Sequence, residues 1–299
     1  MDHPKVVSIG EVLWDLFPDG EKFGGAPANF AHHAASLGDE GIVVSRLGDD
    51  ERGAEARGLL ASLGLSLEFV QSDPDHPTGT VQVEVDDAGV PDFTITEGVA
   101  WDHLAWSDEL AGLARRADCV CFGSLAQRGD VSRATIERFL DELRPGCLRV
   151  FDVNLRQDFF TTEILESSMR RASVVKLNDE ELRPVAEAVG SLAMGDEERA
   201  RALAEAFELD VVCVTCGARG CLLVTPSASA FHPGFPCDVV DTVGSGDAFT
   251  AALAHHLLRG APLRRICEAA NRLGSWVASQ SGATPSADAA VVADVARRE

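Results

Sequence analysis

The chain has 299 residues, of which 45% are hydrophobic and 25% are charged, a composition typical of globular rather than disordered proteins. Its 48 acidic and 26 basic residues give a formal net charge of -22 at pH 7. This charge argues against nucleic acids and anionic membranes as partners, because both are bound through basic surfaces. No apolar run approaches the ~20 residues of a membrane span, and residues 1–5 precede a strand-like run without a secretory signal. We therefore expect a cytoplasmic protein.

Short apolar runs alternate with helical patterns from the start of the chain. Helices are expected at residues 28–37, at 132–143, and from an N-cap at Asp196 to Phe207. This alternation predicts an α/β fold in which helices cover both faces of a mostly parallel sheet. The expected strands are residues 6–9, 42–45, 120–122, 149–153, 174–177 and 211–215.

Residues 80–96 differ, because apolar and polar residues alternate on either side of Asp87-Ala88-Gly89. This pattern predicts an antiparallel hairpin with one exposed face, and hence a small β-sheet that projects from the main body. Such sheets can close over a ligand or join two copies of a chain. We expect one domain over residues 1–299 with a lid from approximately 11–23 and 67–99, and the lid offers a surface for a homodimer.

The eight cysteines do not indicate a metal or redox site. Cys213 and Cys216 form a CxxC pair, but a zinc site needs a second closely spaced pair. A redox CxxC opens a helix, whereas Cys213 lies inside a run that predicts a buried strand. Small buried thiols in a reducing compartment are the favoured interpretation.

Polar or glycine-rich clusters follow four apolar runs, if residues 239–240 are counted as a strand. Ligands of open α/β sheets bind beyond the carboxyl ends of the strands, so four such clusters indicate one shared site. The clusters contain Asp152, Asn154 and Arg156; Lys176, Asn178 and Glu181; Thr215, Gly217 and Gly220; and Asp241, Gly244 and Asp247.

The last cluster opens a helical pattern that ends at Gly260. Gly244, Ser245 and Gly246 allow close backbone approach, and the free N–H groups of a first helical turn bind anions. Asp247 beside them suits a base that takes a proton from an attacking hydroxyl during phosphoryl transfer. Taken alone, Asp247 is explained equally well as an acidic residue favoured by the helix dipole. The Walker A and GxGxxG nucleotide motifs are absent from the sequence.

A different cluster lies near the N-terminus. Asp15 and Asn29 carry acceptors and donors suited to sugar hydroxyls, and Gly24 and Gly25 permit close approach of a ring. A turn carboxylate and a helix-start residue are the structural alternatives for Asp15 and Asn29. His32 and His33 lie deeper in the same helix, where packing alone accounts for them.

These motifs together resemble the ribokinase/fructokinase (PfkB-type) family of carbohydrate kinases. The resemblance rests on Gly24-Gly-Ala-Pro-Ala-Asn29 and Asp241-Thr-Val-Gly-Ser-Gly-Asp247, with residues 48–53, 152–156, 178–181 and 215–220 in the family's order. It spans nearly the whole chain and implies a ribokinase-like three-layer α/β/α fold with a small projecting β-sheet lid. Residues 10–15, 24–29, 100–102 and 151–157 look most like fructokinases.

The resemblance implies ATP-dependent phosphorylation of a sugar hydroxyl with Asp247 as the base. The amides of Gly244, Ser245 and Gly246 would form the anion hole, in which Ser245 replaces a commoner alanine. Arg156 would contact the sugar or the moving phosphate. The other implied residues are Asp15, Gly24, Gly25 and Asn29 for the sugar; Thr215, Gly217, Gly220 and Asn271 for the nucleotide, with Asn271 near the adenine; and Asn178 and Glu181 for indirect placement of Mg²⁺ and the phosphates.

Many members of this family also bind a monovalent cation beside the anion hole. By position, the resemblance implies a K⁺ site. Its residues would be Asp241, Val243, Val277, Gln280, Gly282 and Ser286.

The sequence therefore favours an ATP-dependent sugar kinase, with fructose as the first candidate acceptor. Other acceptors stay open, among them 2-keto-3-deoxygluconate, another hexose, ribose or a nucleoside. Lys22 is the single basic residue between Glu11 and Asn29, which favours a neutral sugar. A catalytically silent sugar-sensing protein is the alternative from another class, although the base and the glycines are retained. An acidic chain can bind ATP because backbone N–H groups and Mg²⁺ supply a local positive potential.

Overall fold

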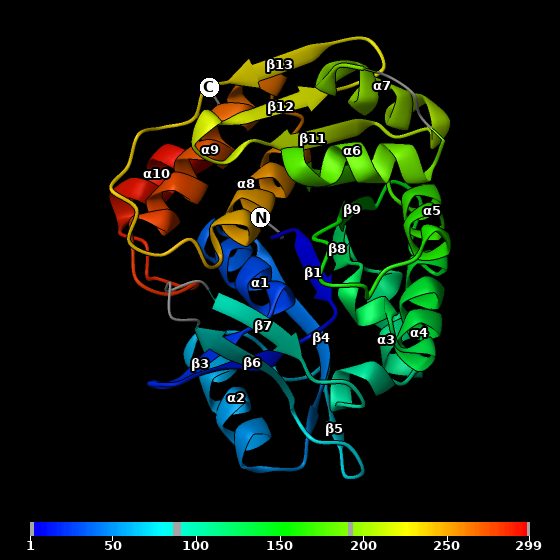
Figure 1. The fold of residues 1–299 in the computed structure, drawn as a ribbon, viewed down its shortest axis with the longest axis vertical. Coiled ribbons are helices and arrows are strands. Elements are labelled where there is room, and N and C mark those ends of the chain that lie inside the picture. The colour runs from blue at the N-terminus through cyan, green and yellow to red at the C-terminus, as the bar shows by residue number, and fades with distance from the viewer. Residues whose placement is uncertain (1–2, 86–90, 191–193, 298–299) are drawn as a thin grey trace.

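A nine-stranded sheet forms the centre of the molecule in the computed structural model, which describes residues 3–85, 91–190 and 194–297. Neighbouring strands are parallel except at the β11–β12 and β12–β13 pairs, which are antiparallel (Figure 1). The six predicted strands are confirmed, whereas β5, β12 and β13 were not predicted. The order is β13 (Ser229–His232), β12 (Cys221–Val224), β11 (Val211–Thr215), β10 (Val174–Asn178), β9 (Leu148–Asp152), β8 (Cys119–Gly123), β1 (Lys5–Ile9), β4 (Glu40–Gly48) and β5 (Val70–Asp73).

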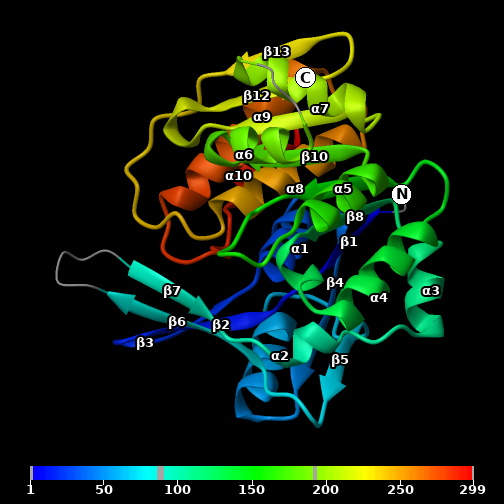
Figure 2. The ribbon, with the colours of Figure 1, turned by 45° about the vertical axis from the view of Figure 1, so that its right-hand side comes forward.

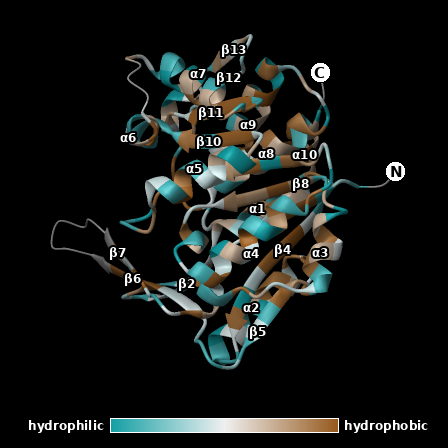
Figure 3. Ribbon diagram, turned by 90° about the vertical axis from the view of Figure 1, so that its right-hand side faces the viewer, coloured by the Kyte–Doolittle hydropathy of each residue, from teal (hydrophilic) through white to brown (hydrophobic). Residues whose placement is uncertain are grey.

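Helices cover both faces of this sheet because its strands are apolar on both sides. In β1, Val7 and Ile9 join one hydrophobic core while Val6 joins the other. The first core packs against α3 (Asp108–Ala114), α4 (Asp130–Asp141), α5 (Thr162–Arg171), α6 (Asp179–Ala188) and α7 (Asp196–Ala206). The second packs against α1 (Ala26–Ser36), α8 (Ser245–Leu257), α9 (Leu263–Ala278) and α10 (Ala289–Ala296), while α2 (Glu51–Ser62) lies against a third, smaller core beside β4. Figure 3 shows the brown, hydrophobic strands running between the helices.

The predicted helices form with small shifts of their ends. The helix expected at 28–37 is α1, which starts two residues earlier, and the helix expected at 132–143 is α4, which occupies 130–141. Asp196 is the first residue of α7 rather than its N-cap. Gly195 takes the cap position, where its amide donates to the carboxylate of Glu198 at 3.1 Å.

A second sheet of four strands projects from the main body (Figure 2). Its order is β3 (Gly20–Gly24), β2 (Leu13–Phe17), β6 (Gly79–Val85) and β7 (Pro91–Ile95), with β2 and β6 parallel and the other pairs antiparallel. The predicted hairpin is confirmed in β6 and β7, and its turn at 87–89 lies outside the described residues. Within the predicted lid range of 67–99, β5 pairs with β4 in the main sheet, whereas β6 and β7 belong to the projecting sheet.

Residues 239–240 do not form the strand that was predicted there. Val239 and Val240 are each 64% exposed and lie in an extended connection between β13 and α8. The amides of Val240 and Asp241 both donate to the carbonyl of Ala278, so the connection is held by the end of α9. The strand prediction failed because residues 239–240 have no neighbouring strand to pair with among the residues that the structure describes.

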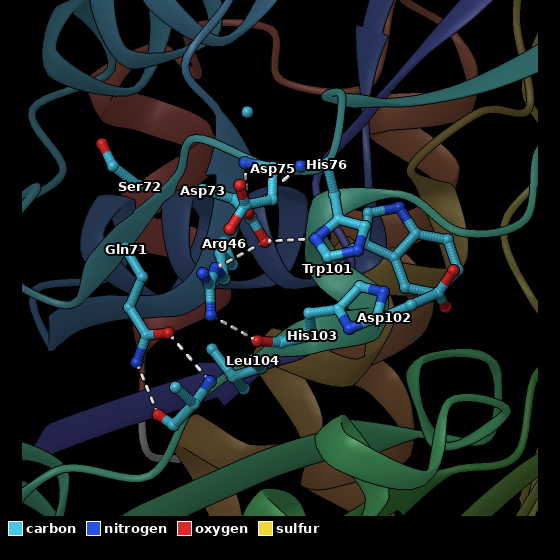
Figure 4. A network of polar contacts seen from close by, with 12 residues as sticks. Arg46, Gln71, Ser72, Asp73, Asp75, His76, Trp101, Asp102, His103 and Leu104 are labelled. Atoms are coloured by element: carbon cyan, nitrogen blue, oxygen red, sulfur yellow. Dashed lines mark hydrogen bonds and ion pairs between the residues drawn. The ribbon is translucent and has the colours of Figure 1, made fainter.

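Polar contacts fasten the main sheet to both connections that lead into the lid (Figure 4). The carboxylate of Asp73, at the end of β5, forms an ion pair with Arg46, whose Nε lies 2.9 Å away, and contacts the ring of His76 at 3.1 Å. Arg46 also donates to the carbonyl of His103 at 2.6 Å, and the rings of His76 and His103 stack 3.5 Å apart. These contacts hold the segment before β6 against the segment after β7.

All eight cysteines are free, and Cys213 is buried inside β11 as the strand prediction required. Among residues 3–85, 91–190 and 194–297, no three His, Cys, Asp or Glu side chains gather so that they could hold a metal ion. The described helices include none with the length and apolar character needed to cross a membrane.

Candidate active site

Two cavities adjoin at the start of α8, at the carboxyl-end edge of the central sheet. The first, of about 630 Å³, lies under the lid, and the second, of about 490 Å³, lies between α8, α9 and the loop after β11. Thr242 and Gly246 line both. A ligand in one cavity can therefore reach a ligand in the other at the first turn of α8.

The lid-side cavity collects the residues that the sequence assigned to a sugar and to proton transfer. We refer to it as the acceptor cavity. Its walls include Asp15, Gly24, Gly25, Asn29, Arg156, Gly244, Gly246 and Asp247.

The second cavity, which we call the nucleotide cavity, collects most of the residues assigned to ATP. Thr215, Gly217, Gly220, Ser245, Gly246 and Asn271 line it. The side-chain N–H of Asn271 donates to the carbonyl of Cys267 at 2.7 Å, which fixes its amide plane in α9. Among the described lining residues there is no charged side chain.

The first turn of α8 presents free amides at the junction of the two cavities. Gly244 has a φ of 76°, and a Cβ there would lie 2.6 Å from the carbonyl oxygen of Ala283, so glycine is required. The amide of Ser245 donates to the carbonyl of Thr242 at 3.2 Å, contrary to the expectation that it belongs to the anion hole. In the described part of the chain, the amides of Gly246 and Asp247 have no backbone acceptor, so these two can bind an anion.

Asn29 holds the carboxylate of Asp247 from the opposite side. The Asn29 side-chain N–H donates to Asp247 Oδ2 at 2.8 Å, although the two residues lie 218 positions apart in the chain. Burial raises the pKa of Asp247 to about 6, against the hydrogen bond from Asn29, which lowers it. The Oδ1 atom of Asn29 is buried without a hydrogen-bond partner among the described residues, and so it can accept from a ligand hydroxyl.

Glu11 is a further carboxyl group in the acceptor cavity that the sequence did not single out. It lies two residues after the end of β1, is 7% exposed, and lines the cavity together with Asp247. Burial raises the pKa of Glu11 to about 7, and the nearby charge of Asp247 raises it further. A Glu two residues after a buried strand was the available signal, but it is equally typical of a turn.

Lys176, which lines the acceptor cavity, forms a buried ion pair with Asp152. Lys176 Nζ lies 3.0 and 3.1 Å from the two carboxylate oxygens of Asp152, its register partner on the neighbouring strand. Thr250 in α8 donates to the same carboxylate at 2.9 Å. The sequence placed both residues at strand ends but assigned neither a role, because pairing across two strands is not visible in the sequence.

Asn178 and Glu181 do not line either cavity. Their side chains cap α6 reciprocally: Asn178 Oδ1 accepts from the Glu181 amide at 2.8 Å, and Glu181 Oε2 accepts from the Asn178 amide at 2.9 Å. Glu181 Oε1 accepts from the amide of Leu155 at 2.7 Å. Both Glu181 oxygens are thus engaged, which does not fit direct coordination of Mg²⁺.

The residues assigned to K⁺ come together in part. The carboxylate of Asp241 accepts from the amides of Val243, at 3.0 Å, and Gly282, at 3.3 Å, which joins the two loops. These three residues line a third cavity between the lid and residues 281–285. The Val277 carbonyl accepts from the amide of Gln280 at 2.9 Å. Asp241 thus brings Val243 and Gly282 together, and the K⁺ site stays a prediction from the resemblance.

Residues 4–290 match the model of the pfkB family of carbohydrate kinases. The chain belongs to this family. The kinase is 30% identical to a fructokinase of Escherichia coli, in an alignment 299 positions long that covers 93% of this chain and 94% of the relative.

Solved structures of sugar and riboside kinases match the kinase over nearly its full length. A double mutant of the fructokinase of Vibrio cholerae, bound to fructose, ADP and a potassium ion, has a TM-score of 0.80 and 25% identity, covering 99% of this chain and 100% of that one. The aminoimidazole riboside kinase of Salmonella enterica, with its riboside and an ATP analogue, has a TM-score of 0.80 and 25% identity, covering 98% and 100%. The fold of the kinase is therefore ribokinase-like, as the sequence resemblance implied.

Proposed function

We propose that this kinase transfers the γ-phosphoryl group of ATP to a hydroxyl of fructose. The observation that carries the proposal is the meeting of the two cavities at Gly246, with Asp247 on the acceptor side. One substrate can lie in each cavity, and the free amides of the α8 turn lie between them.

The proposed reaction uses Asp247 as the base. Its carboxylate is mostly ionised at neutral pH, because its pKa is about 6. It takes the proton of the acceptor hydroxyl as the new P–O bond forms and the bond to ADP breaks. Asn29 orients this carboxylate, and its free Oδ1 accepts from another hydroxyl of the sugar. The amides of Gly246 and Asp247 donate to the oxygens of the transferring group.

Charge in the acceptor cavity favours a neutral sugar over an acidic one. Its lining residues include three carboxyl groups, Glu11, Asp15 and Asp247, of which Glu11 with its pKa of about 7 is partly protonated at neutral pH, against the two cations Arg156 and Lys176. Lys176 is already paired with Asp152. A carboxylated acceptor such as 2-keto-3-deoxygluconate would meet net repulsion, whereas a polyhydroxy sugar can donate to these carboxylates.

The cofactors follow from the same geometry. We propose ATP as the occupant of the nucleotide cavity, with its phosphates toward the α8 turn. Because Asn178 and Glu181 do not fit direct coordination, Mg²⁺ would arrive with the nucleotide phosphates, and we assign no step to it. K⁺ is proposed at Asp241 and the adjoining carbonyls, a site type that the Vibrio relative's potassium ion supports.

A riboside is the second candidate acceptor, because the Salmonella riboside kinase is as similar in structure as the Vibrio fructokinase. An exposed Arg156 at the rim leaves the cavity open to a ligand larger than a monosaccharide. Both candidates use the same base and the same α8 turn.

ADP release over a panel of acceptors tests the proposal. The panel contains fructose, glucose, ribose, 2-keto-3-deoxygluconate, adenosine and aminoimidazole riboside, each with ATP, Mg²⁺ and K⁺, and the rate without acceptor is subtracted. We expect fructose to have the highest kcat/KM, by about tenfold or more. A higher value for another acceptor overturns fructose alone. No turnover of any acceptor supports the silent sugar-sensing alternative.

A further inference from the structure

Lys176 places a buried ammonium group behind the first turn of α8. The residue is 8% exposed and lines the acceptor cavity. A Cβ added to Gly246 would lie 3.4 Å from Lys176 Nζ, so the ammonium and the Gly246 backbone are in near contact. In the part of the chain that the structure describes, the ammonium's side-chain hydrogen bonds go only to Asp152. Since an ammonium has three N–H donors, one is left for a ligand.

Burial lowers the pKa of Lys176, but the charges of Asp152, Asp247 and Glu181 outweigh burial and raise this pKa, so the group is a charged ammonium. The N-terminal end of α8 is already its positive end, and its free amides face the same junction. A charged ammonium beside that end adds to the positive potential that the helix dipole offers an anion. The chain has three lysines among its 26 basic residues, so a lysine here is a departure from its bias toward arginine. An ammonium is a compact point charge that fits a narrow site where a guanidinium fork does not.

We propose that the Lys176 ammonium contacts the phosphoryl group as it passes between the two cavities, which makes Lys176 a further catalytic residue. This inference rests on the proposed function. In the step, the P–O bond to ADP breaks and the P–O bond to the acceptor oxygen forms, while Asp247 takes the hydroxyl proton. Lys176 keeps its own proton and donates a hydrogen bond to a non-bridging oxygen, where negative charge is spread in the transition state.

A structural role for Lys176 makes a different prediction. If the ammonium only neutralises Asp152, its removal matters because Asp152 is left buried and unpaired. In an Asp152→Asn background that penalty does not exist, so Lys176 could be replaced without further loss. A double-mutant cycle between the two residues therefore separates the two roles.

The variants are Lys176→Met, Asp152→Asn and the double variant, each tested with the best acceptor of the wild-type kinase. We expect Lys176→Met to lower kcat by about 100-fold in the Asp152→Asn background, with KM for the acceptor within about threefold. A fall in kcat of less than about tenfold in that background overturns the proposal. The double variant has no unpaired buried charge. It can therefore still be compared with Asp152→Asn if Lys176→Met alone fails to fold.

A binding measurement provides a readout apart from turnover. Calorimetry measures the affinity of each variant for ADP with aluminium fluoride, a mimic of the transferring phosphoryl group, in the presence of Mg²⁺ and the acceptor. Relative to Asp152→Asn, the double variant is expected to bind this mixture at least about tenfold more weakly but ADP alone equally well. Equal affinity for the mixture overturns the proposal. If the wild type turns over no acceptor, the proposed function has failed rather than the assignment of Lys176.

Discussion

The Asn29 side-chain N–H lies 2.8 Å from the Asp247 carboxylate, which ties the first helix of the chain to the turn that opens α8. One helical turn along α1, His33 Nε2 lies 2.9 Å from the carbonyl oxygen of Ala283, and Ala283 backs Gly244. The same face of α1 therefore contacts both sides of the catalytic turn. The orientation of the base and the position of the free amides depend on one helix.

Replacing Asp247 by Asn is expected to remove the base and to stabilise the fold. We expect kcat to fall by about 100-fold to 10,000-fold. The free energy of unfolding at pH 8 should rise by about 1–2 kcal/mol, because the raised pKa means that the ionised carboxyl destabilises the native state above pH 6. Steady-state kinetics and urea unfolding measure the two effects. Near-wild-type turnover would show that Asp247 is not the base.

The pH below which activity is lost in acid should depend on the hydrogen bond from Asn29 to Asp247. In the wild type, kcat/KM should fall about tenfold per pH unit below pH 6, as Asp247 of the free enzyme becomes protonated. The hydrogen bond from Asn29 lowers the pKa of Asp247, so Asn29→Ala should move this fall in kcat/KM to higher pH. Asn29→Ser can restore a donor and is the matched comparison. A fall that stays at the same pH in Asn29→Ala contradicts this account.

Nucleotide affinity should depend strongly on Mg²⁺. The described lining of the nucleotide cavity has no charged side chain, so its residues cannot neutralise a triphosphate on their own. Chelation of Mg²⁺ should weaken ATP binding by about tenfold or more, while adenosine binding should not change. Equal ATP affinity with and without Mg²⁺, measured by calorimetry, is the result that would refute this expectation.

Acid should destabilise the fold through two buried histidines. Burial lowers the pKa of His33 and His256 to about 4, so the unfolded chain binds more protons than the folded one between pH 6.5 and 4. Stability therefore falls as the pH drops through this window, by about 2 kcal/mol per histidine at pH 5. His33→Gln keeps a donor for the Ala283 carbonyl and cannot titrate in this range. The loss of stability between pH 7 and pH 5 should be smaller in this variant, as urea unfolding at both pH values can measure.

Arg128 should stabilise the base of the lid. It pairs with Asp102 through two hydrogen bonds of 2.8 and 2.9 Å, donates to the carbonyl of Thr96 after β7, and lies between the rings of Trp101 and Phe159. Arg128→Met leaves Asp102 buried and unpaired, with an expected loss of about 3–5 kcal/mol.

Adding Asp102→Asn should recover part of the stability that Arg128→Met removes, because no unpaired buried charge remains. Thermal unfolding of the single and double variants compares them. If Arg128→Met alone melts within about 2 °C of the wild type, the ion pair does not hold the lid.

The sequence predicted the central strands because buried parallel strands are apolar runs, and 174–177 or 211–215 can be recognised without any partner. It did not predict β12 and β13, which are short strands at one end of the sheet, where β12 pairs with β11 and β13 pairs with β12. At residues 239–240 the error was the opposite one: a strand was predicted, but the structure has an exposed loop, because these β-branched residues have no strand partner among the described residues. Strand propensity alone does not supply a neighbour.

The candidate site was predictable where motifs are local and not where pairing is distant. Gly244 and Asp247 belong to one turn, and the structure places them on one cavity wall. The ion pair of Asp152 with Lys176 depends on the register of two strands 24 residues apart, which the sequence did not reveal. The capping box of Asn178 and Glu181 was visible as a spacing, but the spacing did not show that both Glu181 oxygens bind backbone amides.

The 218-residue separation between Asn29 and Asp247 has a consequence for synthesis on the ribosome. The strands that carry the sugar-side residues emerge early, while the base and the free amides emerge only when α8 has been made. A nascent chain that ends before residue 244 has neither the proposed base nor the proposed phosphate-binding turn. On the proposed function, ATP consumption therefore has to wait until α8 has been translated and has packed against α1.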